Sequence, residues 1–162
     1  RPPARCAPLP LAALLLRLLI AHPLLAARLP VELLPLDEPE PEWRACAALI
    51  DAIEVGTLDA RATPAILVEH FRSSEHGEAF SRHAAALLEE THSWEDAEST
   101  LNDVVHTLRR RRLEREIDSL IALGRQRKLT PEETLRIGEL LREKARLSPV
   151  GTLGTLPAPQ PP

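Results

Sequence analysis

The sequence predicts an all-α protein in which an N-terminal helical bundle is followed by a long helix and a C-terminal helical hairpin. Strand signals are absent, because Val, Ile, Thr and aromatic residues never alternate over a run, and aromatic residues form only 2% of the chain. Most prolines lie before residue 42 or after residue 148, which leaves the middle of the chain free to form helices. The apolar face of the longest predicted helix also changes side half-way along, which one bundle cannot accommodate.

Composition limits the classes of protein to which the chain can belong. With 162 residues, of which 44% are hydrophobic and 27% charged, the chain can bury one core and carry an appendage. The formal net charge of −4 gives no general attraction to nucleic acid. Cys6 and Cys46 have no metal-binding spacing, and we interpret them as free thiols in a reducing cytoplasm.

The first helix is predicted at about residues 10–21, after a linker remnant at residues 1–8. It is apolar on nearly all sides except at Arg17, so it should be central to the bundle. Arg1 and Arg5 precede the apolar run as they would in a signal peptide, but Arg17 divides the run. We therefore favour a buried helix over a targeting segment, and the run is also too short to span a bilayer.

Proline and glycine then mark the remaining elements of the bundle. The pair His22-Pro23 ends the first helix, a short helical segment follows, and prolines make residues 29–41 irregular. Gly56 is placed to end a helix over residues 42–55. Thr63 and Pro64 are typical of the cap and first residue of a helix that ends near residue 72. The residues expected to face inward from the helix at 42–55 and from another at 75–90 are Trp43, Cys46, Ala47, Ile50 and Ile53, and Phe80, Ala84, Leu87 and Leu88.

The long helix is predicted to run from a cap at Ser93, with Asp96 three residues later, to about Arg127. At about 100° per residue, its apolar side chains form two stripes on roughly opposite sides. The first half must pack on the preceding helices, and the second half must pack on the final helix. The two stripes are Ala97, Leu101, Val104, Val105 and Leu108, and then Leu113, Ile117, Leu120 and Ile121.

The final helix has a strong start signal, because Thr130 is followed by Pro131 and Glu133 completes a capping box. Its expected inward residues are Ile137, Leu140 and Leu141. We expect a bundle over residues 9–110, a hairpin over 111–147 and a disordered tail over 148–162.

Catalytic and metal-binding patterns are weak. The glycines do not cluster before a helix, so nucleotide binding is not expected. Glu89 with His92, and Asp103 with His106, have the three-residue spacing used in dimetal bundles. Such sites also need two further inward Glu residues, and we expect none from the helices at 10–21 and 42–55. We therefore predict no catalytic group, no cofactor and no metal.

The run Arg109–Arg112 is the clearest basic feature. Consecutive residues cover all sides of a helix, and Glu114 and Glu116 are spaced to pair with Arg110 and Arg112. We interpret the run as a solvated junction between the two apolar stripes. The alternative function is a helical nucleic-acid-binding domain that uses this run.

The order of elements resembles the C-terminal, helicase-binding domain of bacterial DnaG-type primases. The segment Leu18–Ala26, with His22-Pro23 at its centre, resembles that family's first helix and break. Leu67–Arg72 resembles a family helix, and Leu120–Arg125 and Leu129–Glu133 resemble its terminal hairpin. The resemblance covers about residues 11–146.

This resemblance implies a module that docks on the N-terminal region of the hexameric replicative helicase DnaB, brings primase to the replication fork and stimulates the helicase. It also implies that the hairpin supplies most of the affinity, and that the chain itself makes no primer. Some relatives bind the acidic tail of single-strand-binding protein. Arg82 could serve that role here, but Pro8, Leu9, Pro10 and Ala13 replace the early basic residues.

We expect the helicase-docking surface at the hairpin. Leu135 and Leu123 fall off the inward stripes and Leu129 lies in the turn, so all three should be partly exposed near the tip. These leucines could instead simply close the turn. The other candidate partner-binding residues, which belong to the flanks, are Leu113, Arg115, Glu116, Leu120, Arg136, Glu139 and Glu143.

Overall fold

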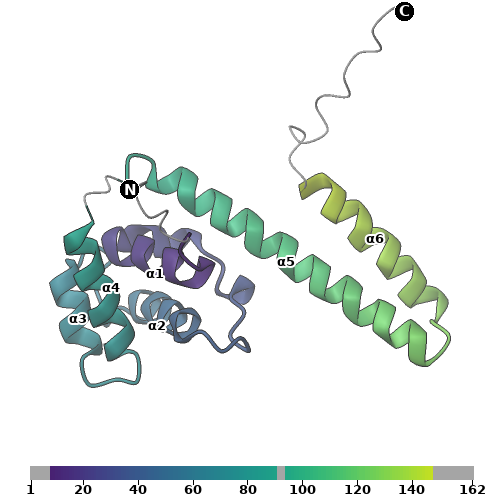
Figure 1. Ribbon diagram of the computed structural model, residues 1–162, viewed down its shortest axis with the longest axis horizontal. Helices are drawn as coiled ribbons and strands as arrows, with labels where there is room; N and C mark the ends of the chain where they lie inside the picture. Colours follow the sequence, from purple (N-terminus) through teal and green to yellow (C-terminus); the bar gives the residue numbers. More distant parts are fainter. Residues whose placement is uncertain (1–7, 91–93, 148–162) are drawn as a thin grey trace, which may run out of the picture. The chain divides into compact units, whose positions relative to one another are not determined.

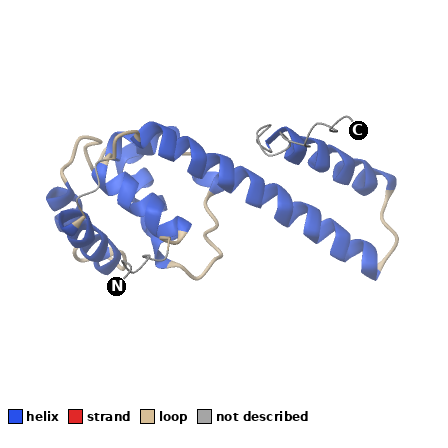
Figure 2. Cartoon of the chain, turned by 45° about the horizontal axis from the view of Figure 1, so that its top comes forward, coloured by secondary structure: helices blue, strands red, loops and turns tan. Residues whose placement is uncertain are grey.

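The computed structural model describes residues 8–90 and 94–147, and every regular element in these ranges is helical, which confirms the all-α prediction (Figure 2). The chain divides into two compact units, residues 1–105 and 106–162. The helices, labelled in Figure 1, are α1 (Leu11–Ala21), the 3₁₀ helices η1 (Pro23–Arg28) and η2 (Val31–Leu33), α2 (Pro41–Val55), α3 (Pro64–Phe71), α4 (Gly77–Glu89), α5 (Ala97–Gln126) and α6 (Pro131–Leu147).

Helix α1 is the centre of the first unit, as its apolar sequence predicts. It contacts α2, α3, α4 and η1 (Figure 1). Its leucines and Ile20 are almost completely removed from solvent, with the exception of the half-buried Leu11 and Leu14. Burial on nearly all sides explains why the helix tolerates so few polar residues.

The ends of α2 and α3 follow the predicted signals. Gly56 ends α2 with a φ of 83°, a left-handed conformation that glycine adopts without steric cost. The hydroxyl of Thr63 accepts a hydrogen bond from the backbone N–H of Ile66 and so caps α3. The rings of Phe71 and Phe80 then stack with centroids 4.2 Å apart, which joins α3 to α4.

The inward face of α4 differs from the prediction. Phe80 and Ala84 are buried, but the Leu88 side chain is 88% exposed, so its predicted inward position is wrong. His83 is buried instead. The prediction placed only apolar residues on the inward face of α4. The predicted face therefore included Leu88 and left out His83.

The start of α5 also differs from the prediction. The expected cap Ser93 lies outside the described residues, and Asp96 accepts a hydrogen bond of 2.9 Å from the backbone N–H of Ser99. Asp96 is therefore the residue that caps the described helix. Leu101 and Val104 of the first apolar stripe are buried, as is Leu108.

In the second unit, the C-terminal part of α5 and α6 lie antiparallel and side by side (Figures 1 and 2). Leu113, Ile117 and Leu140 form the core of this hairpin, and Leu120 and Leu147 pack against them. The second apolar stripe of α5 therefore packs on the final helix, as predicted, and Leu101 is not part of this cluster.

Ile121 and Leu141 were predicted to face inward, and this prediction is wrong. The two side chains are 44% and 50% exposed, and Ile137 is half-buried. Only one helix covers each stripe in a two-helix hairpin, so the buried seam is narrow and residues at its edge stay in solvent.

Candidate protein-binding site

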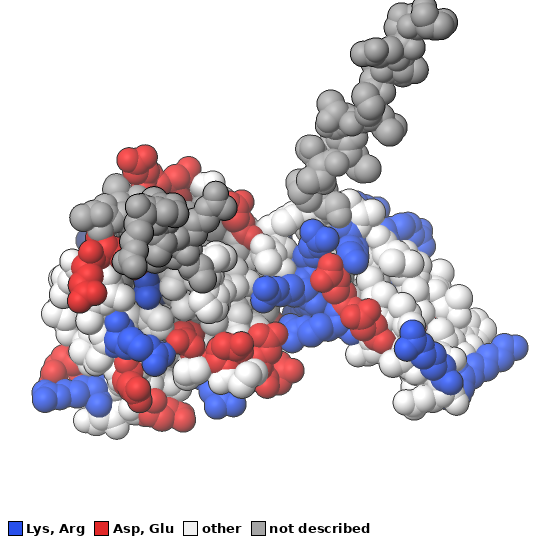
Figure 3. Space-filling model, viewed as in Figure 1, with Lys and Arg blue, Asp and Glu red and all other residues white. Residues whose placement is uncertain are grey.

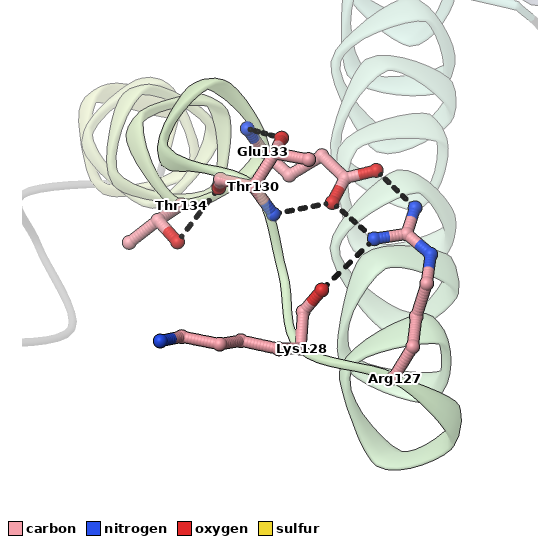
Figure 4. A network of polar contacts seen from close by, with 5 residues as sticks. All are labelled: Arg127, Lys128, Thr130, Glu133 and Thr134. Carbon is pink, nitrogen blue, oxygen red and sulfur yellow. Dashed lines mark hydrogen bonds and ion pairs between the residues drawn. The ribbon is translucent and has the colours of Figure 1, made fainter.

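The turn between α5 and α6 is held by one carboxylate (Figure 4). Glu133 accepts two hydrogen bonds from the Arg127 guanidinium, with N···O distances of 2.9 and 2.6 Å. It also accepts one of 2.9 Å from the backbone N–H of Thr130, whose hydroxyl accepts one of 3.2 Å from the backbone N–H of Glu133. The predicted capping box is therefore confirmed, with the addition of a bidentate arginine.

This network changes the ionisation of Glu133. The hydrogen bonds from Arg127, followed by the one from the Thr130 backbone, lower the pKa of the Glu133 carboxyl to about 2. The charged form is therefore stabilised across the physiological range. The network fixes the first turn of α6, and this positions the residues at the tip of the hairpin.

Leu129 fills the inside of the same turn. A Cβ atom added to Gly124 would lie 3.2–3.5 Å from the side-chain carbons of Leu129. The absence of a side chain at Gly124 thus allows Leu129 to pack closely on α5. Leu129 is half-buried, which supports the turn-closing alternative for this residue.

A groove of about 800 Å³ runs along the outer face of α6, away from the hairpin core. Leu135 lies in its lining and is 61% exposed. The Nε atom of Arg142 donates a hydrogen bond of 3.1 Å to the Gly138 carbonyl, so the arginine side chain lies back along the helix. The residues that line the groove are Lys128, Leu129, Thr130, Pro131, Thr134, Leu135, Gly138 and Arg142.

The groove combines an apolar floor with cationic ends. Its large apolar groups are Leu129, Pro131 and Leu135, and its charged residues are Lys128 and Arg142. On the face of the hairpin drawn in Figure 3, residues other than Lys, Arg, Asp and Glu form a broad area, which is bordered by Lys and Arg side chains and, on one side, by Asp and Glu side chains. An exposed apolar strip with such a rim is typical of a surface that binds another protein segment.

One flank of the hairpin carries a ladder of ion pairs. Arg136 donates a hydrogen bond of 2.9 Å to Glu116 and lies 3.5 Å from Glu139. Burial acts to raise the pKa of Glu114, but hydrogen bonds from Arg110 and Lys144 outweigh this effect and lower it. Since these groups are largely exposed, they orient the two helices more than they stabilise them.

The candidate residues predicted from the sequence lie on different parts of the hairpin. Leu129 and Leu135 line one groove. The predicted partial exposure of the tip leucines is confirmed, because Leu123 and Leu129 are half-buried and Leu135 is exposed. The remaining flank candidates are the buried Leu113, the half-buried Leu120, and the exposed Arg115 and Glu143.

Sequence reasoning missed six residues of the groove, among them Thr134, Gly138 and Arg142 of α6. The signal was present, because these residues follow Pro131 at spacings of three or four, which places them on one helix face with Leu135. They were overlooked because only apolar residues were placed around the helix. At Gly138, the nearest atom to an added Cβ is a guanidinium nitrogen of Arg142 at 3.6 Å, which is an ordinary van der Waals distance.

The basic run Arg109–Arg112 is exposed at all four positions. Arg110 donates a hydrogen bond of 3.1 Å to Glu114, which confirms one of the two predicted pairs. Glu116 pairs with Arg136 of α6. No feature of this run in the described residues favours nucleic acid over a solvated helix surface.

Comparison with known proteins decides between a helicase-docking domain and a nucleic-acid-binding domain. The family described as "DNA primase DnaG DnaB-binding" matches residues 12–140. The chain belongs to the DnaB-binding family of DnaG primases. Its partner is therefore the replicative helicase DnaB, and its role is helicase docking. No curated protein matches the chain.

The bundle of this DnaB-binding domain contains a buried polar cluster that the sequence did not reveal. His83 lies 3.0 Å from a Glu42 oxygen, and its Nδ1 accepts a hydrogen bond of 3.1 Å from Arg17, which also pairs with Glu90. Glu42 is buried, so the expectation that α2 offers no inward Glu is wrong. Burial acts to raise the pKa of Glu42, but the hydrogen bonds from His83 and from the backbone, together with the charge of Arg82, outweigh it and lower the pKa.

Arg82 belongs to the same cluster. It was the candidate residue for binding the acidic tail of single-strand-binding protein. Its guanidinium lies 2.8 Å from Glu42 and is about half-exposed. An acidic tail at this position would have to share the arginine with Glu42. The expected binding of such a tail thus stays a prediction.

Other reactive groups of the DnaB-binding domain lie apart from the groove. Cys46 is a free, buried thiol, and burial, followed by the Glu42 carboxylate, raises its pKa, which suppresses its reactivity. The described ranges hold no cluster of three or more metal-ligating side chains, although His92 lies outside them. Among the helices that the structure describes, none is long and apolar enough to cross a membrane.

Proposed function

We propose that this domain binds DnaB through the hairpin, and that the groove on the outer face of α6 is the main contact surface. Docking through the hairpin brings primase to the replication fork and stimulates the helicase. The domain itself catalyses no reaction and acts in the cytoplasm, where the helicase works.

The exposure of Leu135 carries this proposal. The hairpin core is complete with Leu113, Ile117 and Leu140, so folding does not need Leu135. An exposed leucine beside a groove of about 800 Å³ gains free energy only when a partner covers it. The lysine and arginine at the groove ends favour a helicase segment that carries carboxylates near its apolar residues.

The Leu135→Ser substitution tests this contact, with Leu88→Ser as the matched control. Leu88 is also an exposed leucine, at 88%, but it lies on α4 of the bundle. Loss of a central apolar contact costs about 1–3 kcal/mol, or roughly 5- to 150-fold in Kd. Calorimetry with the N-terminal region of DnaB should show this loss for Leu135→Ser and no loss for Leu88→Ser.

Two other outcomes have distinct meanings. Equal weakening by both substitutions would indicate a contact that extends over the bundle rather than one centred on the groove. Unchanged binding by Leu135→Ser, with helicity intact, would remove the groove from the interface. The flank around Arg115, Arg136 and Glu143 would then be the next surface to test.

A further inference from the structure

Electric charge is divided unevenly between the two compact units. Residues 1–105 carry 8 Lys and Arg against 17 Asp and Glu, which gives a net charge of −9. Residues 106–162 carry 12 Lys and Arg against 7 Asp and Glu, which gives a net charge of +5. The formal charge of −4 for the whole chain therefore hides a strongly acidic unit and a basic one.

The whole positive surplus of the second unit lies at the end of the hairpin opposite the turn. Lys144 lies 3.4 Å from Glu114, so residues 109–115 of α5 adjoin residues 143–147 of α6. These two stretches hold seven cationic side chains and two carboxylates, whereas the rest of the unit has five of each sign. The seven cationic residues, which we call the basic patch, are Arg109, Arg110, Arg111, Arg112, Arg115, Lys144 and Arg146.

The basic patch offers a partner charge and little apolar area. Six of its seven side chains are exposed, and Lys144 is half-buried. Figure 3 shows Lys and Arg side chains gathered at this end of the hairpin. Of the large hydrophobic side chains that are exposed in the described residues, none belongs to the two stretches that form the patch. The groove on α6, in contrast, has the exposed Leu135 in its lining.

We propose that the basic patch attracts an acidic surface of the N-terminal region of DnaB and sets the rate at which the hairpin docks. This proposal rests on the proposed docking through the hairpin and adds a second role to it. The basic patch governs association, and the groove governs dissociation.

The position of the basic patch favours DnaB over nucleic acid as its partner. Arg146 lies one turn beyond Arg142, which lines the groove, so the patch and the groove share a face of α6. A partner that covers the groove therefore also meets the patch. Nucleic acid would find no aromatic side chain in this unit to stack on, because all aromatic residues of the chain precede residue 106.

Long-range attraction acts mainly before the complex forms. Complementary charge raises association rate constants from about 10⁵–10⁶ to as much as about 10⁸–10⁹ M⁻¹ s⁻¹ at low salt. An acidic helicase surface attracts the basic patch and repels the acidic unit, so the hairpin reaches the partner first. Because the charges of the patch are exposed to water, they stabilise the docked complex little, and the dissociation rate depends on the groove.

The substitutions Arg109→Gln and Arg111→Gln together test the basic patch in the full chain. Glutamine forms helices about as well as arginine, so α5 is retained. Arg44→Gln with Arg61→Gln is the matched control, because it removes two exposed arginines from the first unit and changes the net charge equally.

Stopped-flow mixing with the N-terminal region of DnaB measures both rates. In about 0.05 M salt, the patch variant should associate about three- to tenfold more slowly than the unsubstituted chain, and its dissociation rate should change less than about twofold. The control should associate no more slowly than the unsubstituted chain. The difference should disappear in about 1 M salt, where the Debye length falls to about 3 Å.

The outcomes separate the basic patch from the groove. An unchanged association rate of the patch variant, or equal slowing of the control, would overturn the patch even if Leu135→Ser speeds dissociation. Faster dissociation with unchanged association would also overturn it, because the arginines would then act only inside the docked complex. Slower association of the patch variant, with dissociation unaffected by Leu135→Ser, would support the patch and place the error in the groove.

A labelled single-stranded oligonucleotide tests the other class of partner. Salt-sensitive binding of the oligonucleotide that the patch variant loses, with an unchanged rate of association with DnaB, would overturn the proposal in favour of nucleic acid. Equal behaviour of the patch variant and the unsubstituted chain toward the oligonucleotide, with slower association with DnaB, would support it.

Discussion

Arg127 and Glu133 are joined by two hydrogen bonds, of 2.9 and 2.6 Å, across the turn between α5 and α6. The same Glu133 carboxylate accepts the backbone N–H of Thr130, and Arg127 also donates to the Lys128 carbonyl at 3.0 Å (Figure 4). One side chain thus links the last residues of one helix to the first turn of the next. The direction in which α6 leaves the turn depends on this pair.

Glu133→Gln should destabilise the hairpin in a pH-dependent manner. The folded state lowers the pKa of Glu133 from 4.5 to about 2, so its stabilising effect is complete above pH 4.5 and is lost as the pH falls toward 2. Thermal unfolding followed by circular dichroism should give a lower Tm for the variant at pH 7. The difference from the unsubstituted chain should shrink between pH 4.5 and 2.

Glu132→Gln is the matched control for this substitution. It removes the neighbouring charge from the same first turn of α6, where an acidic side chain also favours the helix, but no hydrogen bond to Arg127. A Tm difference for Glu133→Gln that stays constant down to pH 2, or an equal effect of both variants, would show that the pair with Arg127 is not what stabilises the turn.

Substitution of two adjacent leucines of α6 by alanine should destabilise the hairpin to very different extents. Leu140 is completely buried in the hairpin core, so Leu140→Ala should cost about 2–5 kcal/mol and release the hairpin helices. Leu141 is half-exposed, and Leu141→Ala should cost less than about 1 kcal/mol. Hydrogen exchange should report faster exchange over α6 in the first variant alone. Similar exchange in both variants would contradict the assignment of the core.

Removal of Glu42 should destabilise the bundle and not the hairpin. Glu42→Ala leaves a buried His83 nitrogen without its acceptor, which costs about 1–3 kcal/mol. Glu54→Ala removes an exposed carboxylate from the same helix and should have little effect. Urea unfolding of the two variants measures the difference. Equal free energies of unfolding would mean that the polar cluster contributes nothing to stability.

The features predicted correctly from sequence are those in which local chemistry and the fold agree. The shift of the apolar stripe after Leu108 required two separate packing surfaces, and Ile117 indeed packs with Leu140. Gly56 and Thr130 act at helix ends through their own backbone or side-chain geometry, so no distant residue was needed to predict them.

The features missed from sequence depend on distant neighbours. His83 is buried because Arg17 and Glu42, from two other helices, satisfy its ring nitrogens. Ile121 and Leu141 are exposed because the single partner helix is too narrow to cover them. The groove also includes Gly138, which has no side chain, and hydrophobic periodicity does not register such a position.

The binding of a chain truncated after Arg112 to the N-terminal region of DnaB tests the central claim most directly. Circular dichroism and urea unfolding establish that the truncated chain keeps a folded bundle, as its buried α1 core predicts. If the hairpin carries docking, calorimetry should show a loss of affinity of at least about 100-fold, or roughly 3 kcal/mol. A folded truncated chain that binds DnaB as tightly as the full chain would contradict the account.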